Sequence, residues 1–181
     1  LSAAGPIDLT LYDGAKMMVI SPQTIAGLHI ASNSWFIVTN QALTVTGSVT
    51  IDFGGGILAD GTGLPSAQGA GFGATSSPGV YGITGGGGGH GGFGAASAAG
   101  AGGGNSHGML LQPTVIGSGG GRGNGTSPGG QGGAGGGAVR LSVFETLVLN
   151  GVISANGTDG VAPHSGGGSG GSLWITAGTL N

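Results

Sequence analysis

Four histidines are the residues of this chain best suited to binding a metal ion. His90 and His107 lie in glycine-rich surroundings, whereas His29 and His164 lie elsewhere. Protein zinc sites are built from Cys, His, Asp or Glu ligands. The chain has no cysteine, and no carboxylate lies near His90 or His107 in the sequence. We therefore interpret the histidines as structural, and expect no metal site and no cofactor.

The acidic residues could serve hydrolysis or calcium binding. Asp52 and Asp60 flank the run Gly54–Gly56, and carboxylates on one face of a β-solenoid resemble the calcium sites of polysaccharide lyases. Those sites also use a basic residue as catalytic base, and the chain has only three lysines and arginines. A hydrolase with paired carboxylates would have to draw on five Asp and one Glu. We expect that the chain is not an enzyme.

Two tryptophans and one arginine are the candidate contact residues. Trp174 and Arg140 fall at equivalent positions of an internal repeat, and Trp35 is the third candidate. The first two lie on the outward phase of their strands if Leu173/Ile175 and Val139/Leu141 face inward. Outward aromatic side chains can stack on sugars or on a partner subunit, and they can also cover the edge of a solenoid. Both interpretations remain open at this point.

Two sequons make Asn124 and Asn156 candidate glycosylation sites. Asn124-Gly125-Thr126 and Asn156-Gly157-Thr158 both match the acceptor pattern. In a chain so rich in Gly and Thr, two chance matches are unsurprising, so glycosylation is one alternative and coincidence the other.

The charge balance excludes two classes of partner. The net charge is −3, with three basic residues among 181. Nucleic-acid binding needs a basic surface, and attachment to anionic lipid needs basic clusters. No apolar run approaches the ~20 residues of a membrane span. We expect no nucleic-acid partner and no membrane span. Because the chain starts at Leu1 without Met or a charged segment, we also expect that any signal peptide has been removed.

The elements that must position these residues are short strands. From Leu43 to Phe53, odd positions are apolar or Gly, whereas even positions are Thr, Ser or Asp. This alternation predicts strands with one buried and one solvated face. No window shows a helical period, so we expect essentially no helix. A lead-in strand with a turn at Asp13-Gly14 precedes them. Short strands at intervals of six to ten residues fit either a sandwich of hairpins or a β-solenoid.

An internal repeat favours the solenoid. The segment from Leu43 to Thr62 resembles that from Leu141 to Thr158, and the segment from Gly170 to Leu180 resembles that from Gly136 to Leu147. Because the third copy stops at Asn181, we expect that the chain is a piece of a longer, repeated protein. We predict a right-handed parallel β-solenoid forming one domain over 1–181. Strand-rich segments 17–62 and 138–181 flank a glycine-rich excursion over 63–137.

The glycine-rich stretch is the second feature of the architecture. Between Gly54 and Gly137 lie 36 of the 49 glycines. Polyglycine II is a left-handed threefold helix without internal hydrogen bonds, and only Gly permits such helices to approach closely. We expect an ordered, polyglycine-II-like excursion, with a flexible spacer as the alternative. Scattered large side chains are expected to anchor it: Phe72, Tyr81, Phe93, Met109, Leu110, Leu111 and Val115.

The order of these motifs resembles a known kind of repeat. The segment from Gly135 to Gly157 contains Ala138-Val139-Arg140-Leu141 and Leu149-Asn150-Gly151-Val152-Ile153, and a second glycine run follows over Gly166–Gly178. Over about residues 43–181, this looks like the glycine-rich parallel β-helix repeats of very large microbial and protist cell-surface proteins. By composition alone, the glycine-rich stretch also resembles the polyglycine-II sandwiches of some phage tail-tip adhesins.

The resemblance implies an extracellular or cell-surface location and brings no catalytic residues. We expect a structural subunit of an extracellular fibre, filament or surface layer, which assembles with copies of itself through low-charge Gly/Ser/Thr-rich faces. The alternative is an adhesin that presents glycine-rich loops to a surface glycan or receptor, including one of the phage tail-tip kind.

Overall fold

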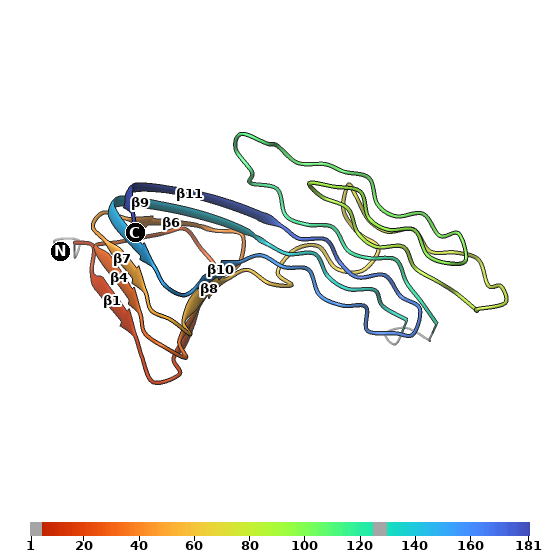
Figure 1. The fold of residues 1–181 in the computed structure, drawn as a ribbon, viewed down its shortest axis with the longest axis horizontal. Helices are drawn as coiled ribbons and strands as arrows, with labels where there is room; N and C mark the ends of the chain where they lie inside the picture. The colour runs from red at the N-terminus through yellow and green to blue at the C-terminus, as the bar shows by residue number, and fades with distance from the viewer. Residues whose placement is uncertain (1–4, 125–129) are drawn as a thin grey trace. The chain divides into compact units, whose positions relative to one another are not determined.

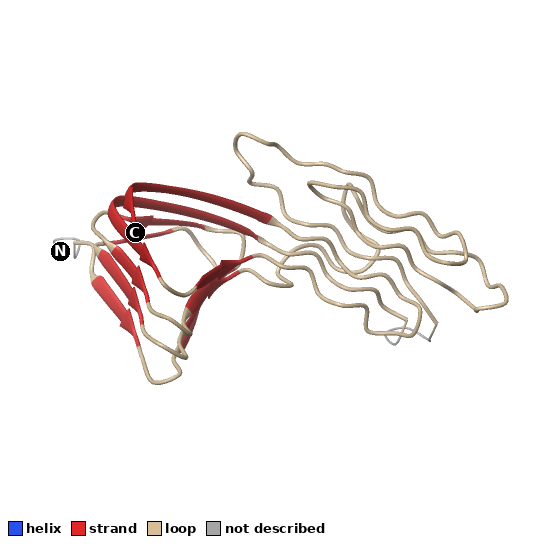
Figure 2. Cartoon of the chain, in the orientation of Figure 1, coloured by secondary structure: helices blue, strands red, loops and turns tan. Residues whose placement is uncertain are grey.

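The computed structural model describes residues 5–124 and 130–181 and is built from β-strands (Figures 1 and 2). Within these residues there are eleven strands and no helix, so the prediction of an all-β chain is confirmed. No helix in this part of the chain could therefore cross a membrane. The strands are β1 (Asp8–Leu11), β2 (Lys16–Val19), β3 (Gln23–Ile25), β4 (Gly27–Ile30), β5 (Trp35–Val38), β6 (Ala42–Val45), β7 (Val49–Ile51), β8 (Gly56–Leu58), β9 (Ala138–Leu149), β10 (Val152–Ser154) and β11 (Ser172–Leu180).

The chain divides into two compact units. Of the described residues, unit 1 holds those up to Leu58 together with Val139–Ser154 and Trp174–Asn181. Unit 2 holds Ala59–Ala138 and Ala155–Leu173. Figure 2 draws nearly all strand residues in unit 1, whereas unit 2 is drawn almost wholly as loop.

Unit 1 consists of parallel strands in two sheets. The seven-stranded sheet has the order β1-β4-β7-β9-β6-β3, with β11 also paired to β9, and the four-stranded sheet has the order β10-β8-β5-β2. The long strand β9 pairs with β6 through its first half and with β7 through its second half. The strands therefore form three stacks: β3, β6 and the start of β9 (first stack), β1, β4, β7 and the end of β9 (second stack), and β2, β5, β8 and β10 (third stack). Strand β11 lies along β9, from the first stack at Thr176 to the second stack at its C-terminal end. The chain visits the three stacks in a fixed rotation.

The register links segments that are separated by a nearly constant length of chain. Asp8 pairs with Gly27, and Leu28 pairs with Val49, so the parallel partners among the first eight strands lie 19 to 21 positions apart. The two longer repeats found in the sequence also lie in register. Leu43 pairs with Leu141 in the first stack, and Ile57 pairs with Ile153 in the third stack.

The core of unit 1 is formed by one face of each stack. Leu43, Val45 and Val49 are almost completely buried, as the alternation predicts. Phe36 is the largest fully buried side chain, and burial of such a side chain stabilises the fold by about 1.5–3 kcal/mol. The alternation ends at Ile51, because the chain turns away after it and leaves Phe53 84% exposed.

Unit 2 is held together by hydrogen bonds between glycine runs, and Gly85–Gly89 is the clearest case. Its five successive amides donate to the carbonyl groups of His164, Ala74, Ala95, Gly167 and Gly71. Donors three positions apart therefore bond to the same neighbouring run. Gly166–Gly171 shows the same period of three, because the amides of Gly168 and Gly171 donate to Thr158 and Ala155.

The close approach of these runs explains why they are glycine. A Cβ atom at Gly166, Gly168 or Gly171 would lie closer than 3.0 Å to a backbone carbonyl oxygen of a neighbouring run, a distance that Cβ atoms essentially never show. At Gly167 the nearest atom is 3.6 Å away and at Gly170 it is 3.8 Å away, which is ordinary contact. None of the five glycines has a left-handed φ. The requirement for glycine is thus steric at three positions and absent at two.

Buried serine hydroxyl groups complete the hydrogen bonding inside unit 2. Ser66 Oγ accepts a hydrogen bond from Gly132 N at 2.8 Å and donates one to Gly120 O at 3.2 Å. Ser118 Oγ accepts a hydrogen bond from Gly71 N at 3.0 Å. Each hydroxyl group takes the place of a backbone partner that a neighbouring run would otherwise supply.

The expected anchors of the glycine-rich stretch do not hold it. Phe72, Tyr81 and Phe93 are 49–79% exposed, Val115 is half-buried, and the others lie at the surface: Met109, Leu110 and Leu111. The prediction that these side chains anchor the stretch was wrong, because backbone and serine hydrogen bonds supply the contacts instead.

Candidate functional site

A cavity of about 490 Å³ in unit 2 is the candidate functional site. Its wall includes His90, His107 and Ser106, together with the apolar side chains of Met109, Leu110 and Leu173. A concave, partly apolar wall with a few polar groups is the usual form of a ligand site. No Asp or Glu is among the residues that line it.

The backbone brings the two histidines of the cavity together. His90 directly follows the run Gly85–Gly89, and His107 lies 17 positions further along the chain. The amide of His107 donates a hydrogen bond to the carbonyl group of His90 at 2.6 Å. The two imidazole rings meet edge to face, with centroids 4.8 Å apart and an interplanar angle of 72°.

Each of the two rings has one nitrogen atom without a hydrogen-bond partner in the part of the chain that the structure describes. Within the described residues, His90 Nε2 and His107 Nδ1 are buried and have no hydrogen-bond partner. The other nitrogen of His107, Nε2, lies 3.4 Å from Ser118 Oγ. A buried polar atom without a partner costs about 1–3 kcal/mol, so these two atoms are the chemically distinctive feature of the cavity.

The environment of His90 favours its neutral form. Burial lowers the pKa of His90 below its ordinary value of 6.5, and a positive charge on His107 lowers this pKa further. The backbone carbonyl groups of Gly171 and Val115 oppose the change without reversing it. At neutral pH the ring therefore offers a lone pair, which can accept a hydrogen bond or bind a metal ion.

The three candidate contact residues lie on two different sheets of unit 1. Arg140 in β9 and Trp174 in β11 lie on neighbouring strands, which the hydrogen bond from Thr176 Oγ1 to Ser142 Oγ also links. Trp35 in β5 belongs to the third stack. All three side chains are half-buried, so each presents only part of its surface.

The two sequon asparagines have different surroundings. Asn124 Oδ1 accepts a hydrogen bond from Ile83 N at 2.7 Å, and Asn124 Nδ2 donates one to Tyr81 O at 2.9 Å. Asn156 is exposed. Thr126, which completes the first sequon, lies outside the described residues. Glycosylation at Asn124 and Asn156 stays a prediction, with Asn156 the more accessible of the two.

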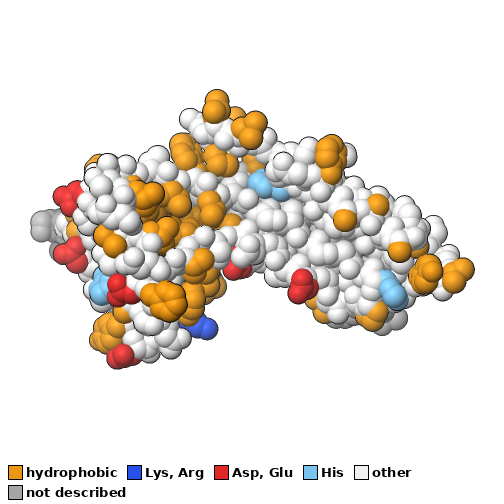
Figure 3. Space-filling model, in the orientation of Figure 1, with side chains coloured by type: hydrophobic (Ala, Val, Ile, Leu, Met, Phe, Trp, Pro, Cys, Tyr) orange, Lys and Arg blue, Asp and Glu red, His pale blue; other side chains and the backbone are white. Residues whose placement is uncertain are grey.

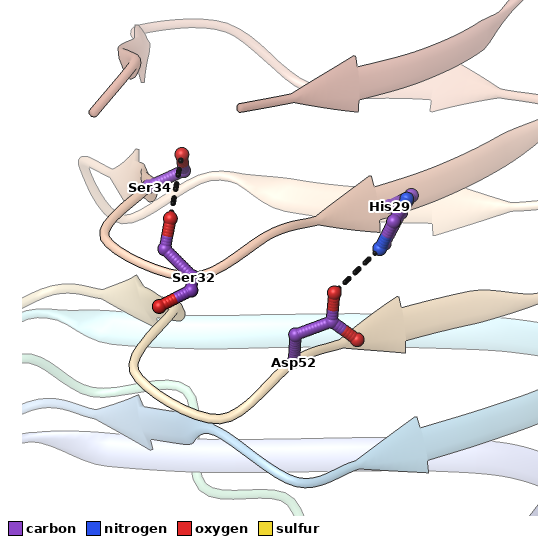
Figure 4. A network of polar contacts seen from close by, with 4 residues as sticks. All are labelled: His29, Ser32, Ser34 and Asp52. Atoms are coloured by element: carbon purple, nitrogen blue, oxygen red, sulfur yellow. Dashed lines mark hydrogen bonds and ion pairs between the residues drawn. The ribbon is translucent and has the colours of Figure 1, made fainter. Parts of the chain in front are cut away.

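The two carboxylates considered for calcium or catalysis have separate partners. Asp52 Oδ2 lies 2.8 Å from His29 Nε2 on the surface of unit 1 (Figure 4). Asp60 Oδ1 accepts a hydrogen bond from Asn156 N at 2.6 Å in unit 2. In the residues that the structure describes, no group of three or more His, Asp or Glu side chains could hold a metal ion.

The surface carries few charged groups. The face drawn in Figure 3 is mostly uncharged, with isolated acidic and basic side chains; hydrophobic side chains gather in the left part of the view and are scattered elsewhere. No protein-family model, curated protein or solved structure matches the chain.

Proposed function

We propose that the chain is a structural unit of an extracellular fibre, filament or surface layer and that it assembles with copies of itself. In this proposal unit 1 is a right-handed parallel β-solenoid, and unit 2 is a bundle of polyglycine-II helices. The fixed rotation of the chain through three stacks supports the solenoid, as does the register of 19 to 21 residues per turn. Repeat proteins of this kind suit extended assemblies, because each turn contacts only its neighbours.

The hydrogen bonding of Gly85–Gly89 supports the polyglycine-II assignment. A helix with three residues per turn and no internal hydrogen bonds must direct its amides to three sides in succession. The amides of Gly85 and Gly88 donate to one neighbouring run, and those of Gly86 and Gly89 donate to a second. The amide of Gly87 donates to a third.

One observation carries the proposal of assembly: the runs of unit 2 associate mainly through backbone groups, supplemented by a few buried serine hydroxyl groups. An outer run of one copy can extend the same bonding to an outer run of another. Gly102 is exposed and has no atom within 4 Å of the position of a Cβ, so its run presents an open flank. Few charges would have to lose their hydration on contact, which favours close association of protein surfaces.

The assembly proposal is tested by sedimentation velocity and negative-stain electron microscopy over a series of protein concentrations. We expect particles that grow with concentration and show a regular axial repeat. Gly102→Glu adds bulk and charge to the open flank and should weaken assembly without unfolding the chain. Gly79→Glu, at an exposed turn glycine that is also without close neighbours, controls for the added charge. A wild-type chain that stays monomeric at all concentrations refutes the proposal.

A second candidate function is that of an adhesin. It is favoured by large apolar side chains exposed in segments between the glycine runs: Val80 is 98% exposed, and Leu110 is 100% exposed. Such side chains gain the most from contact with a receptor or glycan. Saturable binding on a glycan array, weakened by Trp174→Ala and by Leu110→Ser, is the expected result. Absence of binding to any glycan or receptor would exclude this function.

A further inference from the structure

The His90–His107 cavity contains a donor set that the structural role does not use. His90 Nε2 is buried without a partner and lies beside Gly108, where a Cβ atom would be 3.1 Å from it. Gly108 stands between His107 and Met109, and all of these residues line the cavity. The free nitrogen of His90 therefore faces the segment that carries a second imidazole and a thioether.

The donor types select among metal ions. Calcium and magnesium require oxygen ligands, mainly carboxylates, and the cavity wall contains no Asp or Glu. Structural zinc sites are closed by four protein ligands. Thioether sulfur is a soft donor that selects copper(I), and imidazole also suits copper. We propose that His90 and His107 bind one copper(I) ion in this cavity, with Met109 as the third ligand.

The proposal gives the unpaired nitrogens a partner. The ring centroids of His90 and His107 are 4.8 Å apart, which puts both rings within reach of one ion. His107 Nδ1 lies beside Gly71, so binding involves a rotation of this ring about its Cβ–Cγ bond, a torsion that is soft in histidine. Binding is a coordination step and transfers no electron.

The test is a competition for copper(I) between the full 181-residue chain and the chromophoric chelator bathocuproine disulfonate, with ascorbate and without oxygen. The wild-type chain is expected to withdraw one equivalent of copper(I). His90→Ala and His107→Ala should each weaken binding by at least about 10- to 100-fold, the loss that changes in outer-shell partners of a metal already cause. Met109→Leu, which keeps the volume of the side chain, should weaken it by a smaller factor.

Two variants serve as matched controls, because each removes an exposed histidine outside the cavity. His29→Ala and His164→Asn should bind copper(I) like the wild type; Asn is chosen at position 164 because His164 has a φ of 63°, which Asn tolerates. Absence of copper(I) binding overturns the proposal, as does equal loss in control and cavity variants. Tighter zinc binding with the same dependence on His90 and His107 also overturns the assignment to copper.

A second measurement keeps the test decisive where a cavity variant does not fold, as judged by its circular dichroism. X-ray absorption of the copper-loaded wild-type chain is expected to show two nitrogen scatterers and one sulfur scatterer. A shell of oxygen scatterers, or one without sulfur, contradicts the assigned ligands.

Discussion

Within one glycine run, a Cβ atom is excluded at some positions and tolerated at others. This difference predicts opposite effects of alanine at neighbouring residues. Gly167 and Gly168 are adjacent and both lack a left-handed φ. A Cβ at Gly168 would overlap the carbonyl group of Ala134, whereas a Cβ at Gly167 would have its nearest neighbour, Thr158 O, at 3.6 Å. We expect Gly168→Ala to destabilise unit 2 and Gly167→Ala to leave it equally stable or more stable.

The magnitudes follow from two opposing effects. Replacing Gly by Ala where the backbone can accept it stabilises a protein by about 0.4–1 kcal/mol, because the unfolded chain loses freedom. Overpacking of a tight interior typically costs about 1–3 kcal/mol. Because both variants replace Gly by Ala, the effect on the unfolded chain is common to them. Their free energies of unfolding should therefore differ by the overpacking cost, about 1–3 kcal/mol, with Gly167→Ala the more stable.

The assay is urea denaturation of both variants and the wild type, with native-state hydrogen exchange of the amides of unit 2. Transition midpoints are compared at equal slope, since a changed slope would indicate a changed denatured state. Gly171→Ala and Gly170→Ala repeat the comparison three residues further along, because Gly171 is tight and Gly170 is open. If Gly167→Ala destabilises as much as Gly168→Ala, the threefold packing that we infer is refuted.

Three further predictions concern the core, the buried hydroxyl groups and acid. Phe36→Ala should cost about 3–5 kcal/mol in urea denaturation because it empties a fully buried site, whereas Phe53→Ala should stay within about 0.5 kcal/mol of the wild type; equal effects would contradict the assigned core. Ser66→Ala removes the partner of two backbone groups and should cost about 1–3 kcal/mol, with faster exchange of the amide that it bonds; unchanged exchange would speak against that bond. Because the pKa of His90 is lowered in the fold, the unfolded chain binds the proton more readily. The contribution of neutral His90 to the free energy of unfolding is therefore complete above pH 6.5 and is lost as the pH falls below it. His90→Gln should flatten this pH dependence of stability. An unchanged slope of the free energy of unfolding against pH would exclude His90 as its source.

The all-β nature of unit 1 could be predicted because burial alternates along a strand. Leu43 and Val45 face the core and Thr44 does not, as the spacing indicates. The internal repeat identified Leu43 and Leu141 as equivalent positions, and the structure places them side by side in the first stack. The alternation predicted a buried side chain at Phe53 and was wrong there, because a turn replaces the strand at this residue.

The candidate site could be predicted only in part. His90 and His107 were noted because of their residue type, but 17 positions of glycine-rich chain separate them and no local pattern places them in contact. Their contact depends on how the glycine runs fold back on one another. The exposure of Leu110 was not predicted for the same reason. From the sequence alone, an apolar side chain in a glycine-rich stretch is equally consistent with a buried anchor and with an exposed residue.

The sequence by itself determined the strands, the repeat and the low charge, because these depend on residue type and on spacing along the chain. Only the tertiary structure decided which glycines are indispensable and which side chains meet. The physical reason lies in the hydrogen bonding of the glycine runs, since the amides of Gly85–Gly89 find their partners in other segments of the chain. Where local hydrogen bonds are absent, local sequence cannot specify the neighbours, and the fold as a whole must supply them.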